Sequence, residues 1–269
     1  MAEAKRRPRG LHPFRFLAEQ RLHLAVVLIV AAALPLCTSS ASAQDDITFD
    51  PTITQEQFET FSRLVAQGIY ATPVDSARAR GLLGFDIGVG AAAIPVDTDE
   101  PYWQNSVAED FTVSDHVVVP RVIVSKGLSV ATVSAMYAKV PDSDIAMMGA
   151  SLDVPILSGG VVTPTLAVRG AYATLQGVDS FDLNTYGVEL FLSKGFGPIT
   201  PYVAVGRARS DAEGRIVPPD DSAPITLTDE ADSNRITVGV KLSLLLPKIV
   251  VEATQGEERS YAAKVSFGF

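Results

Sequence analysis

The residues best suited to nucleophilic catalysis are Ser114, Asp115 and His116, which combine a hydroxyl, a carboxylate and an imidazole. A catalytic triad needs the imidazole bonded to both partners. These three residues are consecutive at the start of an apparent strand, where neighbours point to opposite faces. They cannot form a triad with one another, although a more distant serine could still pair with the imidazole. The pattern favours a histidine at a rim, and we expect neither an enzyme nor a bound cofactor.

Two acidic segments, "PVDTDEPYWQNSVAEDFTVSD" and "PPDDSAPITLTDEAD", could supply oxygen ligands to a hard cation such as calcium. The candidate ligands are Asp97, Asp99 and Glu100 in the first segment and Asp229, Glu230 and Asp232 in the second. Neither segment has the spacing of an EF-hand loop, and charge runs in loops are usually solvated. We therefore predict no metal site.

A third set of charges lies within segments of strictly alternating polarity, about one charge per segment. Its members are Asp86, Arg121, Asp153, Arg169, Glu189, Lys241, Glu252 and Lys264. Their signs alternate along the series. If the segments are strands of a membrane barrel, each basic side chain facing lipid would cost about 2–4 kcal/mol at mid-membrane. These charges are therefore predicted to point inward. They form either a ring of ion pairs low in a narrow lumen, with Lys264 meeting Asp86, or a set of unrelated charges in a wet interior.

The first 43 residues have the three parts of a secretory signal peptide: a basic leader, the apolar run "LHLAVVLIVAAALPL", and the small-residue pattern Ala41-Ser42-Ala43 before Gln44. We predict cleavage between Ala43 and Gln44, with a retained anchor as the alternative. The only cysteine, Cys37, would leave with the leader. The remaining chain has 16 basic and 29 acidic residues, a net charge of −13 that excludes nucleic acid as a partner.

Residues 44–80 are predicted to be a periplasmic segment containing one amphipathic helix. Its apolar positions Phe58, Phe61, Leu64, Val65 and Ile69 recur at helical spacing, after Thr54 as an N-cap. A narrow barrel filled by its own side chains leaves little room for a helix. We therefore expect this helix outside the lumen, at the periplasmic mouth, although it could instead cap or enter the barrel.

Residues 81–269 change to a period of two and predict an antiparallel β-barrel of about ten strands, with eight to twelve compatible with the pattern. Connections after the even-numbered strands read as tight turns, whereas those after the first and seventh are long. This asymmetry is typical of bacterial transmembrane barrels. The polar faces of the strands are rich in Gly, Ser and Thr, as in "RITVGVKLS", which suits a crowded interior better than a solvated surface.

The chain ends "YAAKVSFGF", with Tyr261, Val265, Phe267 and Phe269 at alternating positions. This segment resembles the terminal signal of Gram-negative outer-membrane β-barrel proteins, in which a final Phe follows alternating apolar residues. The resemblance implies that the barrel-assembly machinery recognises the last strand, which then closes against the first. It also implies a chain exported to the outer membrane of a Gram-negative bacterium and surrounded there by lipid.

Function is less determined than fold, because one fold supports many functions. The first hypothesis is a narrow or gated channel for small solutes. The second is a non-conducting structural or adhesive surface protein that acts through its outer loops, with an unknown extracellular partner. The third, a barrel enzyme acting on lipid or peptide, is disfavoured by the shortage of histidine.

Overall fold

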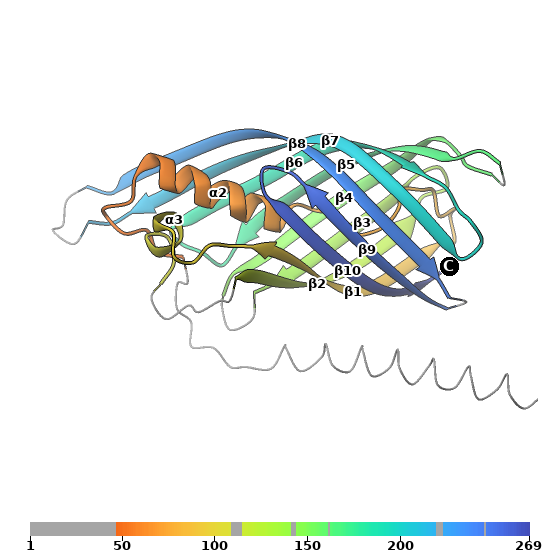
Figure 1. Cartoon of the computed structure of the whole chain (residues 1–269), viewed down its shortest axis with the longest axis horizontal. Helices are drawn as coiled ribbons and strands as arrows, with labels where there is room; N and C mark the ends of the chain where they lie inside the picture. The colour runs from red at the N-terminus through yellow and green to blue at the C-terminus, as the bar shows by residue number, and fades with distance from the viewer. Residues whose placement is uncertain (1–46, 109–114, 141–143, 161, 219–222, 245) are drawn as a thin grey trace, which may run out of the picture. The chain divides into compact units, whose positions relative to one another are not determined.

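The computed structural model describes residues 47–108, 115–140, 144–160, 162–218, 223–244 and 246–269. The described strands form one closed antiparallel barrel, in which each strand pairs with its neighbours along the chain and the last closes against the first (Figure 1). They are β1 (Phe85–Pro95), β2 (His116–Gly127), β3 (Thr132–Lys139), β4 (Ala146–Leu157), β5 (Thr165–Gln176), β6 (Phe181–Ser193), β7 (Ile199–Ile216), β8 (Ile225–Ser243), β9 (Pro247–Gln255) and β10 (Arg259–Gly268).

The predicted barrel and its ten strands are confirmed. Alternation places Ile236, Val238 and Val240 of β8 on the exposed outer wall, while Thr237 and Lys241 of the same strand are buried inside. The largest difference lies at β7 and β8, which extend to a pairing of Ile216 with Ile225. Most of the acidic connection predicted after the seventh strand therefore continues the two strands beyond the rest of the wall.

The barrel closes through the ends of the strand series. Phe85 and Phe269 exchange both backbone hydrogen bonds, at 2.9 and 3.0 Å between nitrogen and oxygen. Their rings meet edge to face with centroids 4.7 Å apart. The alternating segment "YAAKVSFGF" therefore consists of most of β10 together with the C-terminal residue Phe269. It pairs with β1 and so closes the sheet.

The two ends of the barrel differ. We call the end that carries the connections after β1, β3, β5, β7 and β9 the loop end, and the opposite end, where β1 begins and β10 finishes, the turn end. The connection after β1 (residues 96–115) contains the short helix α3 (Pro101–Gln104). The predicted contrast in loop length is otherwise weaker than expected, since residues 158–164 after β4 outnumber residues 256–258 after β9.

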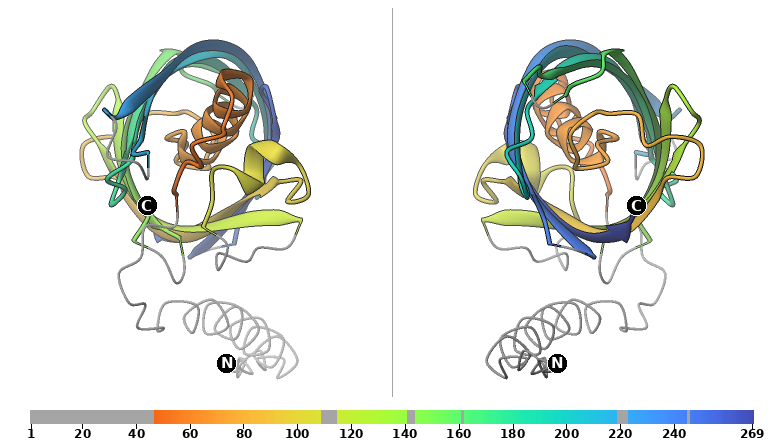
Figure 2. Two further views of the ribbon diagram at one scale, coloured as in Figure 1. Left: turned by 90° about the vertical axis from the view of Figure 1, so that its left-hand side faces the viewer. Right: turned by 90° about the vertical axis from the view of Figure 1, so that its right-hand side faces the viewer.

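A helix, α2 (Gln55–Ile69), lies inside the ring of strands (Figure 2). It begins with the predicted N-cap Thr54, whose hydroxyl accepts from the Gln57 amide while the Gln57 side chain accepts from the Thr54 amide. The helix contacts β1, β5, β6, β7, β8 and β10. The expectation of a helix outside the lumen is therefore wrong.

Small inward residues explain why the helix fits. At three inward glycines of β4, β6 and β7, an added Cβ would overlap the N-terminal segment. It would lie 2.8 Å from Ala71 Cβ at Gly149, 2.6 Å from the Tyr70 hydroxyl at Gly187 and 2.4 Å from the Phe58 ring at Gly214. The wall alanines Ala138, Ala173 and Ala212 are also buried. A ten-stranded wall carrying such small side chains leaves space that larger ones would fill.

The two described helices do not qualify as membrane spans, since neither has the length and hydropathy that a spanning helix requires.

Candidate functional site: the occupied lumen

The loop half of the lumen is apolar. Phe58, Phe61, Leu64 and Ile69 of α2 are buried there. Phe49 packs edge to face against Phe58 and against Phe181 of β6, with ring centroids 5.3 and 5.6 Å apart. The wall supplies the other side of this core, because its inward residues near the loop end include Ile94, Val119, Met147, Leu175 and Leu183. The apolar stripe of the helix is thus covered by the barrel itself.

Polar side chains fix the opposite face of α2 to the wall. Arg63 contacts both carboxylate oxygens of Asp229 in β8 at 3.3 Å. The Gln67 side chain accepts a hydrogen bond from Arg235 at 2.6 Å and donates one to the Ser260 hydroxyl at 2.8 Å. The Arg235 guanidinium also lies over the Tyr70 ring, 3.9 Å from its centroid.

After α2 the chain continues along the lumen towards the turn end, where Asp75 is the centre of a charged cluster. Its carboxylate accepts a hydrogen bond from Lys241 Nζ at 2.6 Å and is paired with Arg80. Lys264 Nζ lies 3.9 Å from the same carboxylate. All four side chains are almost fully buried. Such a group is stable only while the charges compensate one another, since an unpaired buried ion is costly.

Wall side chains also bind the backbone of this segment. Arg169 donates to the Asp75 carbonyl at 2.9 Å, and Lys264 donates to the Pro73 carbonyl at 2.7 Å. The Thr72 hydroxyl donates to Glu252 at 3.0 Å. The segment is therefore recognised through its main chain as well as through its one carboxylate.

A second carboxylate, Asp86 of β1, lies at the turn end. It accepts a hydrogen bond from Lys248 at 2.8 Å and lies 3.6 Å from both Lys264 and Arg80. Since Lys264 and Arg80 also contact Asp75, the two carboxylates share their cations.

All eight charges predicted to form a ring lie buried on the inner wall. The structure brings together Asp86 with Lys264, and Asp153 with Arg169, whose guanidinium binds the carboxylate at 2.6 and 3.0 Å. It does not bring Glu189 against Arg169, although the two are directly opposed in register; the Glu189 partner is Arg235 at 3.8 Å.

The other three predicted ring members depart from wall pairing. Lys241 binds Asp75 of the N-terminal segment, and Glu252 accepts hydrogen bonds from Thr72 and from the Tyr202 hydroxyl, the latter at 2.7 Å. Arg121 donates to the Gly68 carbonyl at 3.0 Å and has no carboxylate within ion-pair distance among the described residues. The charges are organised around the enclosed segment.

The sequence analysis did not assign five charged residues of this site: Arg63 on the predicted helix, Asp75, Arg80, Arg235 and Lys248. For Arg235 and Lys248 the signal was present, because both fall on the inward phase of their strands. Asp75 and Arg80 precede the first strand, in "TPVDSARARG", where no periodicity gives a direction. A second available signal was that Val117, Val118 and Val119 make β2 apolar on both faces near the loop end, which predicts an apolar partner inside.

The residues considered for catalysis and for cation binding do not come together in the structure. His116 begins β2, is exposed and pairs with Pro95 in register, while Ser114 lies outside the described residues. Asp229 faces Arg63 inside the barrel, whereas Glu230 lies on the outer face beside Arg209, so the strand separates them. Within the described ranges no group of three or more His, Cys, Asp or Glu side chains is arranged to hold a metal ion. The predicted cleavage residues Ala41, Ala43 and Gln44 also lie outside the description.

The outer wall is a belt of exposed apolar residues to which every strand contributes, including Val89, Val122, Leu190, Val205 and Val251. In the C-terminal segment, Tyr261, Phe267 and Phe269 are exposed on this surface, and Val265 shares their outward phase. A water-soluble protein rarely leaves so continuous an apolar surface uncovered. A closed barrel with an apolar exterior instead satisfies the backbone and side chains within lipid.

The closed sheet, its apolar belt and its charged interior define an outer-membrane β-barrel protein. Among solved structures, the chain resembles the N-terminal barrel domain of OprF from Pseudomonas aeruginosa (TM-score 0.33, 11% identity, covering 70% of this chain and 99% of that one). It also resembles Neisserial surface protein A (0.32, 11%, 69% and 97%) and the protease OmpT from Escherichia coli (0.39, 7%, 74% and 100%). No family model and no curated protein matches the sequence. The assignment rests on the strand topology and the outer surface.

Proposed function

We propose that the protein is a gated channel for small solutes, held closed by its N-terminal segment, residues 47–80, which we call the plug. The observation that carries this proposal is how the plug is attached. From residue 53 to residue 80 the described backbone–backbone hydrogen bonds all stay within the plug, whereas at its start Thr48 and Asp50 donate to the carbonyls of Ser106 and Asn105 in the connection after β1. From residue 53 onward the plug is tied to the strands of the wall by side chains alone, so this part can move while the hydrogen-bond ladder of the barrel stays intact.

A strained residue within the plug supports this reading. Val74 is fully buried with a φ of +47°, a left-handed conformation that a β-branched residue rarely adopts. It immediately precedes Asp75 and follows Pro73, whose carbonyl binds Lys264. Strain of this kind persists only where the surroundings impose it, and it is frequent in segments that switch between conformations. Release of the plug would relieve it.

A non-conducting structural protein is the second candidate. The aromatic cluster of Phe49, Phe58, Phe61 and Phe181 favours it, because four interlocked rings fix the helix more firmly than a mobile gate requires. In this alternative the plug is a permanent core of the barrel. Either candidate places the loop end on the outside of the cell and leaves the protein without enzymatic activity.

A reversible lock separates the two candidates. An added Cβ at Gly149 lies 2.8 Å from Ala71 Cβ, so the A71C/G149C pair needs a shift of less than ~1 Å to reach disulfide geometry. The only native cysteine, Cys37, precedes the predicted cleavage site. Single-channel currents would be recorded from the refolded mature protein, residues 44–269, before and after reduction.

A gated channel predicts current steps in the wild type and in the reduced pair, and silence in the oxidised pair. Steps that are identical in the oxidised and reduced pair would exclude the plug as the gate. Silence of the wild type and of both forms, with a folded barrel, would favour the non-conducting alternative.

A further inference from the structure

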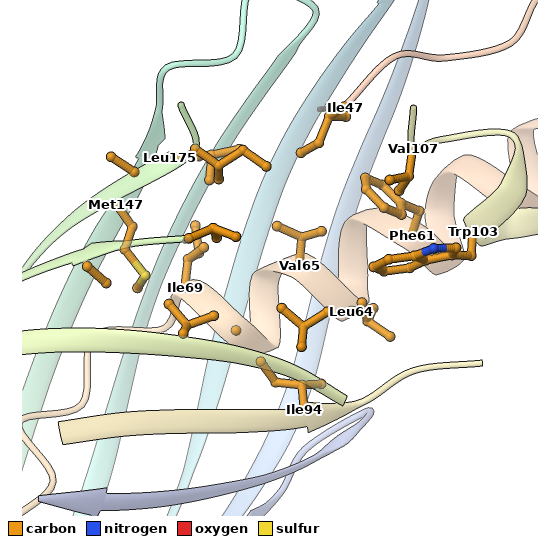
Figure 3. Close-up of a pocket in the computed structure, with 17 residues that line it drawn as sticks. Ile47, Phe61, Leu64, Val65, Ile69, Ile94, Trp103, Val107, Met147 and Leu175 are labelled. Atoms are coloured by element: carbon orange, nitrogen blue, oxygen red, sulfur yellow. The ribbon is translucent and has the colours of Figure 1, made fainter. Parts of the chain in front are cut away.

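A cavity lies between α2 and the wall strands β1 to β5, in the loop half of the lumen (Figure 3). Its volume is about 70 Å³, and its described lining contains no charged or polar side chain. Leu64, Val65 and Ile69 of the helix line one side, and Val119, Ala138 and Met147 line the other. An apolar cavity is unusual in a lumen whose turn half is filled with ion pairs, since barrel interiors are generally polar.

The volume and lining of this cavity limit what it can bind. The lining residues of α2 run from Phe61 to Ile69, a span of about 12 Å at the rise of an α-helix. An engineered apolar cavity that accepts benzene has a volume of ~150 Å³, about twice the volume here. A volume too small for an aromatic ring, lined along about 12 Å of helix, matches a single unbranched alkyl chain.

Beyond this cavity the lumen becomes polar, and the polar groups limit how far a bound apolar chain can extend. Ala138 of the lining is directly opposite Arg121 in register, and the Arg121 guanidinium binds the carbonyl of Gly68, another lining residue. An apolar chain cannot continue past this buried cation without losing favourable surroundings. The cavity is therefore a terminal site for the end of a chain while the plug is in place.

We propose that this cavity binds an unbranched alkyl chain, supplied either by the tail of a membrane lipid or by a soluble alkyl compound. Binding would be driven by the burial of methylene groups, with no requirement for a charged head group. The proposal does not depend on whether the barrel conducts, because it concerns occupancy of the resting, plugged state.

The chain provides its own reporter. Trp103 is the only tryptophan in the sequence and lines the cavity beside Phe61, with ring centroids 6.2 Å apart. A bromine atom on a bound chain would quench its fluorescence by contact. In the first arm, 1-bromobutane is titrated into vesicles of unbrominated lipid that carry the refolded protein. In the second arm, the vesicle lipids themselves carry brominated acyl chains and no bromobutane is added.

Two variants with opposite effects on the cavity complete the test. Ala138→Leu fills part of it, and Met147→Ala enlarges it while leaving Trp103 in place. We expect saturable quenching in at least one arm, weakened roughly tenfold by A138L, since a bound chain would lose about two buried methylenes. M147A should retain quenching and also accept 1-bromohexane.

Quenching by bromobutane alone identifies a soluble compound, and quenching in brominated vesicles alone identifies a lipid tail. Absence of quenching in both arms would overturn the proposal. Quenching of equal strength in wild type, A138L and M147A would also overturn it, because the bromine would then reach Trp103 from outside the cavity. The M147A arm keeps the test decisive if A138L does not refold.

Discussion

Asp75 accepts a hydrogen bond from Lys241 at 2.6 Å, across a contact that joins the N-terminal segment to the opposite wall at β8. The carboxylate belongs to the plug and the ammonium to the barrel, so this ion pair forms only when the plug is seated. Arg80 and Lys264 flank the same carboxylate. The charge balance of the turn half of the lumen thus depends on two residues of the plug, Asp75 and Arg80.

Removing one of the three cations should loosen the plug without releasing it. Lys241→Met leaves Asp75 with Arg80 and Lys264, so we expect a smaller loss than the ~3–5 kcal/mol associated with a buried charge left without partners. The measurement is the maleimide labelling rate of a cysteine at Ser62, which is fully buried in α2. A rise of roughly tenfold corresponds to about 1.4 kcal/mol. A cysteine at the exposed Thr52 controls for reagent access, and an unchanged rate at Ser62 would contradict the role given to Lys241.

We expect that α2 can pack in its observed position against β7 only if residue 214 is a glycine. An added methyl group would lie 2.4 Å from the Phe58 ring, and such overpacking typically costs about 1–3 kcal/mol. Gly214→Ala is therefore expected to speed labelling of the Ser62 cysteine. The matched control is Gly170→Ala on the outer face, where an added Cβ meets nothing within 4 Å. Equal labelling in the two variants would mean that Phe58 does not hold the helix against β7.

The contact between Phe85 and Phe269 should stabilise barrel closure. Phe269→Ala keeps the backbone hydrogen bonds but removes an edge-to-face ring pair, worth about 0.5–1.5 kcal/mol beyond its buried area. We expect a lower midpoint of urea unfolding in vesicles and slower refolding. Phe269→Tyr retains the ring and should behave like the wild type. A loss of the same size in both variants would show that the ring pair is not the cause.

The strands of the barrel could be predicted from the sequence, whereas the segment that they enclose could be predicted only in part. Alternation in segments such as "RITVGVKLS" specifies both the strand and its inward face, because a shift of one residue would expose Lys241 to lipid. The helix was also predictable, from its cap Thr54 and its apolar stripe. Its location was not, because the space inside a barrel depends on which small side chains from distant strands meet there, such as Gly149, Gly187 and Gly214.

The predicted charges illustrate the same limit. Strand phase correctly gives the buried positions of Asp153, Arg169 and Glu189, since a two-residue period leaves each only one face. Their partners depend on a segment without periodicity. Asp75 takes Lys241, and Arg169 turns partly to the Asp75 carbonyl, so pairing along the wall is incomplete. The ring hypothesis did not include a chain inside the ring.

In the proposed channel the plug closes the lumen and Asp75 anchors it. The most direct test compares single-channel currents of the wild type, Asp75→Asn and Asp153→Asn in planar bilayers. Both substitutions remove one buried carboxylate, but Asp153 is a wall residue that pairs with Arg169 of the neighbouring strand, whereas Asp75 belongs to the plug. We predict rare openings in the wild type and in D153N, and frequent or sustained openings in D75N. Currents of D75N that match those of D153N, or silence of all three folded proteins, would contradict the account.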